Sequence, residues 1–272
     1  MRDYTAQRGS SGTRRRGVHF WVRIAFVVWA VVSTTWFLNI FRTRDVPAAM
    51  LADDERVTVR DSDATLEFHP VGEAAATGLV FITGGGVAPE AYVPLLRPIA
   101  EHGFPVYIVK LPYWMAPLER HKQTAVGRAL DVIDGTDAEH WVVAGHSLGG
   151  ALASRVAARA PQSLVAMVLI GTSHPKEIDL SGTPIAVTKV YATNDGVATP
   201  EMIDTTRDLL PATTRWVEIA GGNHSQFGNY GHQLFDGEAT ISRARQQEIT
   251  RAALLNAVEA ARSEPFTPHP TQ

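Results

Sequence analysis

The sequence contains no cysteine, and this absence excludes several kinds of chemistry at once. The chain can form no disulfide, no thiolate metal site, no cysteine nucleophile and no acylated lipoprotein cysteine. The glycine run 84–86 lacks the spacing of a dinucleotide-binding loop, and no Walker lysine follows it. A metal pair of His224 and His232 has no third ligand at a helpful spacing. We therefore expect no metal and no cofactor.

Positive charge is scarce outside the first 44 residues. Eight arginines stand there against the single acid Asp3, which leaves 17 basic and 27 acidic residues from Asp45 onward. A domain with this net charge of −10 repels phosphate, so nucleic acid is disfavoured as a partner. The hydrophobic content of 45% is ordinary for a packed globular protein.

One long apolar run extends from Ile24 to Phe41. As a helix, its 18 residues reach about 27 Å, close to the thickness of a membrane's hydrocarbon core. Six arginines precede the run and two follow it, which predicts a single-pass anchor with the N-terminus cytoplasmic and the following domain extracytoplasmic. The alternative is a cleaved signal peptide and a secreted domain, although no small-x-small cleavage site closes the run.

The chain divides accordingly into five parts. We predict a basic cytoplasmic leader at 1–19, a transmembrane signal anchor at 20–41, a linker at 42–56, one large α/β domain at 57–262 and a loose tail at 263–272.

Strands and helices are expected to alternate within the domain, after an opening hairpin of strands 57–60 and 65–68. The other predicted strands cover 79–83, 106–110, 141–144, 164–170, 185–192 and 215–219. The predicted helices cover 89–102, 148–159, 200–210 and 241–262, and a further helix with no defined start runs through 125–133. Apolar strands separated by helices are typical of a mainly parallel sheet covered on both faces. The 14 residues at 171–184 are too few for a helical cap, so the site should be open.

The stretch Gly145-His146-Ser147-Leu148-Gly149 has the Gly-x-Ser-x-Gly pattern of a nucleophile elbow. Glycine at both ends lets a strand turn sharply into a helix and hold the serine exposed. The predicted strand before this stretch and the predicted helix after it supply that context. Ser147 is therefore the predicted nucleophile, and His146 a packing or rim residue.

Several stretches together resemble the α/β-hydrolase family, in particular its small capless branch near the dienelactone-hydrolase-like proteins. The resemblance covers roughly 57–262 and rests on residues 81–87, 145–149, 194–196, 221–231 and 237–243. It implies an α/β-hydrolase fold with a mainly parallel central sheet, helices on both faces and no cap domain. It also implies a triad in the order serine, acid, histidine.

Asp195 and His224 fit that order. Asp195 directly follows the predicted strand 185–192, and His224 follows strand 215–219 through a glycine-rich loop. Asp204 and Asp208 are rival acids on a predicted helix, and His232 is the alternative base. We expect Asp195 to orient His224, which removes the serine proton.

An oxyanion hole should complete this site. The resemblance assigns one donor to the backbone N–H of Leu148 and the other to the glycine-rich loop, where we choose Gly86, with Gly85 and Val87 as alternatives.

The aromatic residues Tyr113, Trp114 and Phe227 are candidates for lining a substrate pocket. The expected reaction is hydrolysis of a small-molecule carboxylic ester or thioester through an acyl-enzyme. An acyltransferase would use the same triad with another acceptor. A non-catalytic, membrane-anchored binding protein with a hydrolase fold is the third possibility.

Overall fold

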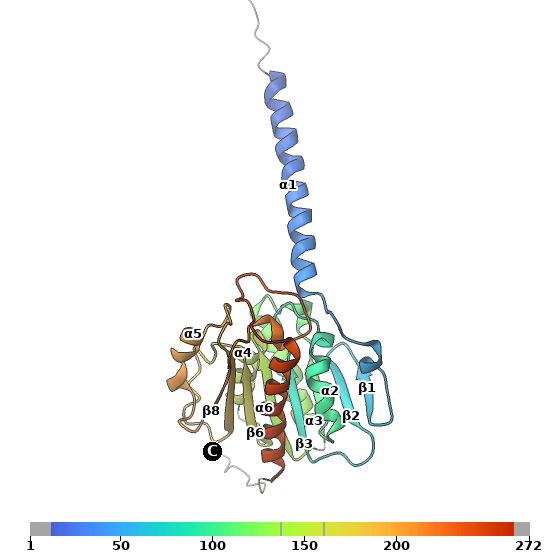
Figure 1. The fold of residues 1–272 in the computed structure, drawn as a ribbon, viewed down its shortest axis with the longest axis vertical. Helices are drawn as coiled ribbons and strands as arrows, with labels where there is room; N and C mark the ends of the chain where they lie inside the picture. The colour runs from blue at the N-terminus through green and yellow to red at the C-terminus, as the bar shows by residue number, and fades with distance from the viewer. Residues whose placement is uncertain (1–11, 137, 160, 264–272) are drawn as a thin grey trace, which may run out of the picture. The chain divides into compact units, whose positions relative to one another are not determined.

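The computed structural model describes residues 12–136, 138–159 and 161–263 (Figure 1). The chain forms two units, Met1–Ile40 and Phe41–Gln272. Helix α1 (Gly12–Phe41) makes up the first unit and ends at the first residue of the second. Its segment His19–Phe41 has 23 residues and a mean hydropathy of 1.9, long and apolar enough to cross a membrane. Part of the predicted leader (1–11) and most of the predicted tail (264–272) lie outside the described residues.

The second unit is built around an eight-stranded sheet in the order β1-β2-β4-β3-β5-β6-β7-β8 (Figure 1). Its strands are β1 (Val57–Asp61), β2 (Thr65–Pro70), β3 (Thr77–Ile82), β4 (Val106–Val109), β5 (His140–His146), β6 (Leu164–Ile170), β7 (Ala186–Ala192) and β8 (Arg215–Ile219). The pairs β1–β2 and β2–β4 are antiparallel, and all the other pairs are parallel. The predicted opening hairpin and mainly parallel sheet are thus confirmed.

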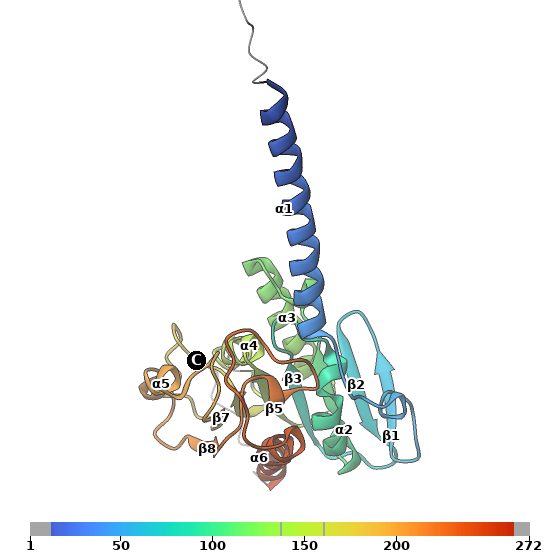
Figure 2. The same ribbon diagram turned by 45° about the horizontal axis from the view of Figure 1, so that its top comes forward.

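Helices cover both faces of this sheet (Figure 2). Helices α2 (Val93–Glu101) and α6 (Arg243–Ser263) pack on one face, and α3 (Glu119–Gly135) and α4 (Leu148–Ala157) on the other. Alternate side chains of the central strands feed two separate apolar cores, because successive residues of a strand point to opposite faces. Short helical pieces complete the unit: η1 (Ala48–Leu51), η2 (Pro89–Tyr92), η3 (Pro112–Trp114), α5 (Pro200–Asp204), η4 (Arg207–Leu209) and η5 (Ser225–Phe227).

One predicted helix is divided in the structure, and another has its start defined there. The predicted helix 200–210 is divided into α5 and η4, where the Thr206 hydroxyl donates to the carbonyl oxygens of Ser173 at 3.0 Å and Ile203 at 3.1 Å. A threonine side chain that bonds to nearby carbonyls competes with regular helix geometry. Helix α3, whose start the sequence does not define, begins at Glu119, because residues 119–124 are mostly polar and carry no apolar periodicity to reveal the first turns.

The residues predicted as a linker, 42–56, belong to the second unit and pack against the rest of it. Val46 and Met50 lie against the apolar core. The buried Arg97 guanidinium donates to the carbonyl oxygens of Met50 at 2.8 Å and Ala52 at 2.9 Å, and pairs with Asp54 at 2.7 Å. This segment is therefore a clamped part of the domain, although its acidic composition is typical of a loose linker.

The carboxyl ends of the parallel strands lie at one edge of the sheet, which we call the carboxyl edge. Residues 171–185, which connect β6 to β7, contain no helix, as predicted. Loops that follow parallel strands meet at this edge, which is where open α/β sheets place their ligand sites.

Candidate active site

Ser147 lies at the sharp turn between β5 and α4. Its backbone has φ 55° and ψ −118°, and its N–H donates to the carbonyl oxygen of Ile170 at 3.0 Å. The flanking positions must be glycine, because the backbone around them leaves no room for a Cβ atom. A Cβ on Gly145 would lie 2.2 Å from the Gly149 oxygen, and a Cβ on Gly149 would lie 2.0 Å from the Ile82 oxygen. The strained, partly exposed serine is the geometry expected of a nucleophile elbow.

Asp195 and His224 meet as an acid–imidazole pair. His224 Nδ1 and Asp195 Oδ2 are 2.8 Å apart, and both residues are buried. The other carboxylate oxygen, Oδ1, accepts the backbone N–H groups of Val197 at 2.8 Å and Ala198 at 2.7 Å. The loop after β7 therefore fixes the carboxylate, and the carboxylate fixes the imidazole.

Asp236, which the sequence reasoning missed, ties the acid loop to the base loop. Its Oδ1 accepts the N–H of His224 at 3.0 Å and of Gly196 at 3.2 Å. Its Oδ2 accepts the N–H of Ser225 at 2.8 Å and the Ser225 hydroxyl at 2.6 Å. In the sequence Asp236 precedes a glycine, as turn aspartates do, so no local signal separates it from a turn residue.

His146 lies beneath the base as a neutral, buried ring. The Tyr92 hydroxyl accepts the N–H of Gly84 at 3.0 Å, which leaves its own hydrogen for His146 Nδ1 at 2.9 Å. The rings of His146 and His224 are 4.5 Å apart. Burial, and secondly the nearby His224, hold the pKa of His146 well below its usual range. His146 is thus a packing residue and does not reach the rim.

The glycine-rich loop after β3 narrows the choice of oxyanion donors. The Gly86 N–H is already engaged, because it donates to the carbonyl oxygen of Trp114 at 2.8 Å. The Val87 N–H bonds within its own loop at 3.2 Å. Among the described residues, no hydrogen-bond acceptor meets the N–H of Gly85 or Leu148. A Cβ on Gly85 would lie 3.3 Å from Leu148 Cδ2, so these two residues are neighbours.

The three predicted pocket aromatics are not gathered around one cavity. Phe227 is fully buried, with its ring 5.3 Å from that of His146, so it supports the site from below and does not line an open pocket. Tyr113 and Trp114 lie in the loop after β4, with 78% and 63% of their surface exposed.

The rival acids and the alternative base lie apart from the Asp195–His224 pair. Asp204 is exposed and pairs with Arg207 at 3.0 Å, and Asp208 is exposed on η4. His232 is also exposed, 3.9 Å from a Glu238 carboxylate oxygen.

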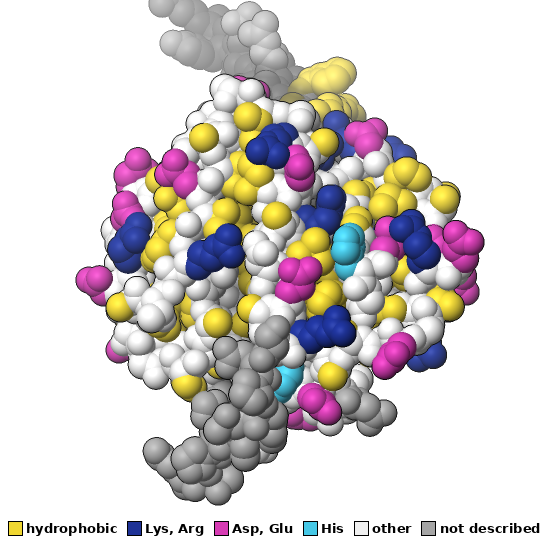
Figure 3. Space-filling model, turned by 60° about the horizontal axis from the view of Figure 1, so that its bottom comes forward, with side chains coloured by type: hydrophobic (Ala, Val, Ile, Leu, Met, Phe, Trp, Pro, Cys, Tyr) yellow, Lys and Arg dark blue, Asp and Glu magenta, His cyan; other side chains and the backbone are white. Residues whose placement is uncertain are grey.

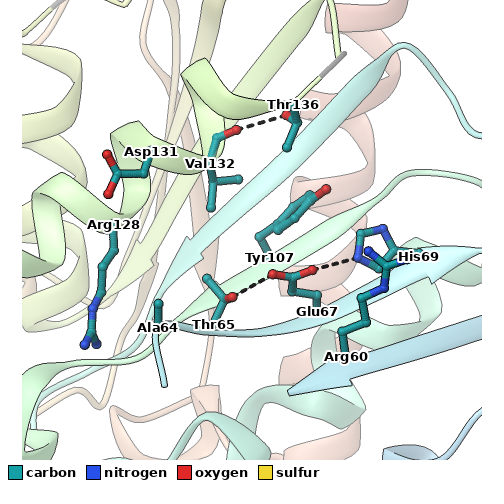
Figure 4. Close-up of a pocket in the computed structure, with 10 residues that line it drawn as sticks. All are labelled: Arg60, Ala64, Thr65, Glu67, His69, Tyr107, Arg128, Asp131, Val132 and Thr136. Atoms are coloured by element: carbon teal, nitrogen blue, oxygen red, sulfur yellow. Dashed lines mark hydrogen bonds and ion pairs between the residues drawn. The ribbon is translucent and has the colours of Figure 1, made fainter. Parts of the chain in front are cut away.

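A separate hollow lies beside β2, β4 and α3, and none of the predicted site residues lines it (Figure 4). The Glu67 carboxylate in it accepts from the Thr65 hydroxyl at 2.7 Å, and its other oxygen is 2.8 Å from His69 Nε2. Since both oxygens are engaged and no nucleophile stands opposite them among the lining residues, we assign this hollow no chemistry.

Comparisons with known proteins support the family and the fold. The family described as alpha/beta hydrolase matches residues 78–248. Among curated proteins, a "Putative non-heme haloperoxidase" of Mycobacterium phage D29 is 31% identical over 103 residues, which cover 36% of this chain and 37% of that protein. The chain thus matches little more than a third of that relative's length.

Solved structures share the fold at low sequence identity. A predicted CIB-like hydrolase from Thermoplasma acidophilum has a TM-score of 0.58 and 12% identity, covering 74% of this chain and 99% of that one. An alpha/beta hydrolase enzyme from a sediment metagenome of the Mar Chica lagoon in Morocco has a TM-score of 0.51 and 20% identity, with coverage of 62% and 90%. A Thermus thermophilus protein has a TM-score of 0.54 and 16% identity, with coverage of 77% and 100%.

Proposed function

This chain belongs to the alpha/beta hydrolase family, and on that premise we propose that it is a serine hydrolase that cleaves an ester-type bond through Ser147, His224 and Asp195. The observation that carries the proposal is the buried 2.8 Å contact between His224 Nδ1 and Asp195 Oδ2. That contact leaves the opposite ring nitrogen, Nε2, as the atom that can take a proton from a serine.

The reaction proceeds in two halves. His224 Nε2 takes the Ser147 hydroxyl proton as Oγ attacks the substrate carbonyl carbon, and the same proton is then given to the leaving alcohol or thiol. A water molecule next attacks the acyl-enzyme, giving one proton to His224, and the acid product leaves as Ser147 regains its hydrogen. The N–H groups of Leu148 and Gly85 receive the oxyanion, because both lack other acceptors among the described residues.

We further propose that α1 anchors the enzyme, with the catalytic unit on the extracytoplasmic side. The apolar segment His19–Phe41 supports the anchor, and the excess of arginine before it supports the orientation.

Labelling with a fluorophosphonate tests the nucleophile directly, using the full chain in detergent. We expect the wild type and the exposed-serine control Ser181→Ala to be labelled, and Ser147→Ala to be unlabelled. Turnover of p-nitrophenyl esters of graded acyl length should fall by about 10³-fold or more in Ser147→Ala alone. If folded Ser147→Ala is labelled as strongly as the control, Ser147 is not the nucleophile.

A further inference from the structure

Exposed apolar side chains of the catalytic unit are concentrated on two loops. Eight large hydrophobic residues of this unit are exposed among the described residues, and six of them occupy 113–118 and 234–235. We call these six the apolar rim: Tyr113, Trp114, Met115, Leu118, Leu234 and Phe235. Their exposed fractions range from 43% for Met115 to 83% for Phe235. Exposed apolar side chains concentrated on a few loops are typical of an interaction surface.

The two halves of the apolar rim stand on opposite sides of the elbow. The first half follows β4, and the carbonyl oxygen of Trp114 accepts the Gly86 N–H of the neighbouring glycine-rich loop at 2.8 Å. The second half precedes Asp236, whose carboxylate holds the His224 N–H at 3.0 Å. The second half also lies against the loop after β7, since a Cβ on Gly196 would be 2.2 Å from the Phe235 carbonyl oxygen. Because β5 lies between β3 and β7 in the sheet order, the turn that carries Ser147 lies between the two loops that the halves contact.

Backbone conformation keeps the apolar rim in place. Tyr113, Trp114 and Phe235 have φ values of 53°, 60° and 70°, in the left-handed region that bulky residues rarely occupy. Holding bulky side chains in this conformation costs free energy, and such strain accumulates where it serves function. Core packing does not explain these conformations, because all three side chains are exposed.

The first residues of the catalytic unit are held at this same edge. Phe41, the last residue of the apolar segment, stacks on Tyr230 with ring centroids 6.3 Å apart, and its ring lies 3.2 Å from where a Gly86 Cβ would be. Residues after Phe41 are also fixed, since the backbone N–H of Arg44 donates to the backbone carbonyl oxygen of Asn229 at 2.7 Å. The point at which the chain leaves an anchor is therefore fixed beside the glycine-rich loop.

The lower end of the unit in Figure 1 has a different surface. Figure 3 turns this end toward the viewer and shows lysine, arginine, aspartate and glutamate side chains spread among hydrophobic ones. A surface of mixed charge suits water, whereas the uncharged segment from Leu111 to Leu118 suits the headgroup region of a bilayer.

We propose that the apolar rim enters the surface of the membrane that carries the anchor, and that the substrate is an amphiphilic ester held in that leaflet. This inference rests on the proposed hydrolase function and specifies its substrate class. Hydrolysis breaks the acyl C–O bond, with water supplying the hydroxyl of the released fatty acid and the hydrogen of the released alcohol. Aromatic and aliphatic side chains at the site entrance would shelter the acyl chain as it leaves the lipid.

Site-specific labelling tests the membrane contact without any need for activity. The chain has no cysteine, so Phe235→Cys and Val71→Cys each provide a single attachment point for an environment-sensitive fluorophore in the full chain. Val71 is the matched control, because it is 52% exposed but lies just after β2, at the opposite edge of the sheet. In phosphatidylcholine vesicles, we expect a blue shift and quenching by nitroxide lipids for the label at 235 only. Equal signals at both sites, or none at 235, overturn the proposal.

Activity in the same vesicles tests the substrate class. Leu234→Gln with Phe235→Asn removes apolar surface, and asparagine tolerates the left-handed backbone at 235. Turnover of a vesicle-borne long-chain umbelliferyl ester should fall about tenfold, while that of the water-soluble acetate stays within about twofold. A parallel loss on both esters refutes the substrate assignment. A wild type inactive on both refutes the hydrolase function, and the labelling result still decides whether the rim meets lipid.

Discussion

Replacing Asp195 with asparagine should inactivate the enzyme without unfolding it, through a tautomer change that the structure specifies. Two backbone N–H groups, from Val197 and Ala198, donate to Asp195 Oδ1. In the variant the amide oxygen must stay at this position, since an NH₂ group cannot accept those hydrogens. The amide nitrogen then points to His224 Nδ1 and donates to it. The ring proton moves to Nε2, where it blocks acceptance of the Ser147 proton.

The size of the loss follows from this change. An enzyme whose histidine is held in the wrong tautomer loses about 10⁴-fold in kcat, which corresponds to about 5.5 kcal/mol of transition-state stabilisation. Stability should change little by comparison, by about 1–2 kcal/mol, because the side-chain shape and the two backbone hydrogen bonds persist and the bond to His224 only reverses its donor.

Steady-state turnover of p-nitrophenyl acetate and thermal unfolding measure the two quantities on the same preparation. Asp204→Asn is the matched control, because Asp204 is exposed and pairs only with a surface arginine, Arg207. It should retain wild-type turnover. The reasoning fails if Asp195→Asn keeps more than about a tenth of wild-type kcat, or if the control loses as much.

Three further substitutions test other parts of the structure. Asp236→Asn should lower kcat by up to about 100-fold with little change in KM, because the substitution loosens the backbone that positions His224. Steady-state kinetics measure both constants, and a rise in KM with unchanged kcat would show that the loop only binds substrate. Burial lowers the pKa of Lys189 to about 7, so the unfolded chain binds more protons between pH 7 and 10.5 and stability rises with pH there. Lys189→Met should therefore stabilise most at pH 7 and below, with the gain shrinking by about 1.4 kcal/mol per pH unit toward pH 10; urea unfolding that shows a constant gain contradicts this. Gly149→Ala should cost at least about 3 kcal/mol of unfolding free energy by calorimetry, since its Cβ would overlap the Ile82 carbonyl; an unchanged Tm would show that the elbow can relax.

The sequence predicted the sheet well where the chain itself carries the signal. The bounds of β6 and β8 coincide with the predicted 164–170 and 215–219. The first is an uninterrupted apolar run that ends at Gly171, and the second is a short stretch containing tryptophan, valine and isoleucine that ends just before a glycine-rich loop. The strand–elbow–helix around Ser147 was also predictable, since the two glycines are demanded by contacts within the motif and with the adjacent β3.

What the sequence could not predict depends on contacts between distant segments. The Gly86 N–H is occupied by a carbonyl 28 residues further along the chain, so choosing a free amide in that loop requires the folded arrangement of β3 and β4. Asp236 resembles a turn residue in the sequence, and only the folded structure shows that its carboxylate joins the loops of Gly196 and His224. The acidic segment at 53–55 is typical of a linker by composition. Its role in holding the buried guanidinium of Arg97 is visible only in the folded structure.

The Arg97 clamp decides where the chain can be cut to obtain a water-soluble catalytic fragment. A fragment beginning at Val57 would remove the carbonyl oxygens of Met50 and Ala52 and the Asp54 carboxylate, leaving Glu101 as the remaining partner of the guanidinium. Losing these acceptors would leave guanidinium N–H groups of the buried Arg97 without hydrogen-bond partners, which destabilises the folded domain. Expression of the catalytic unit should therefore start at or before Phe41, which keeps both the clamp and the packing of Phe41 on Tyr230.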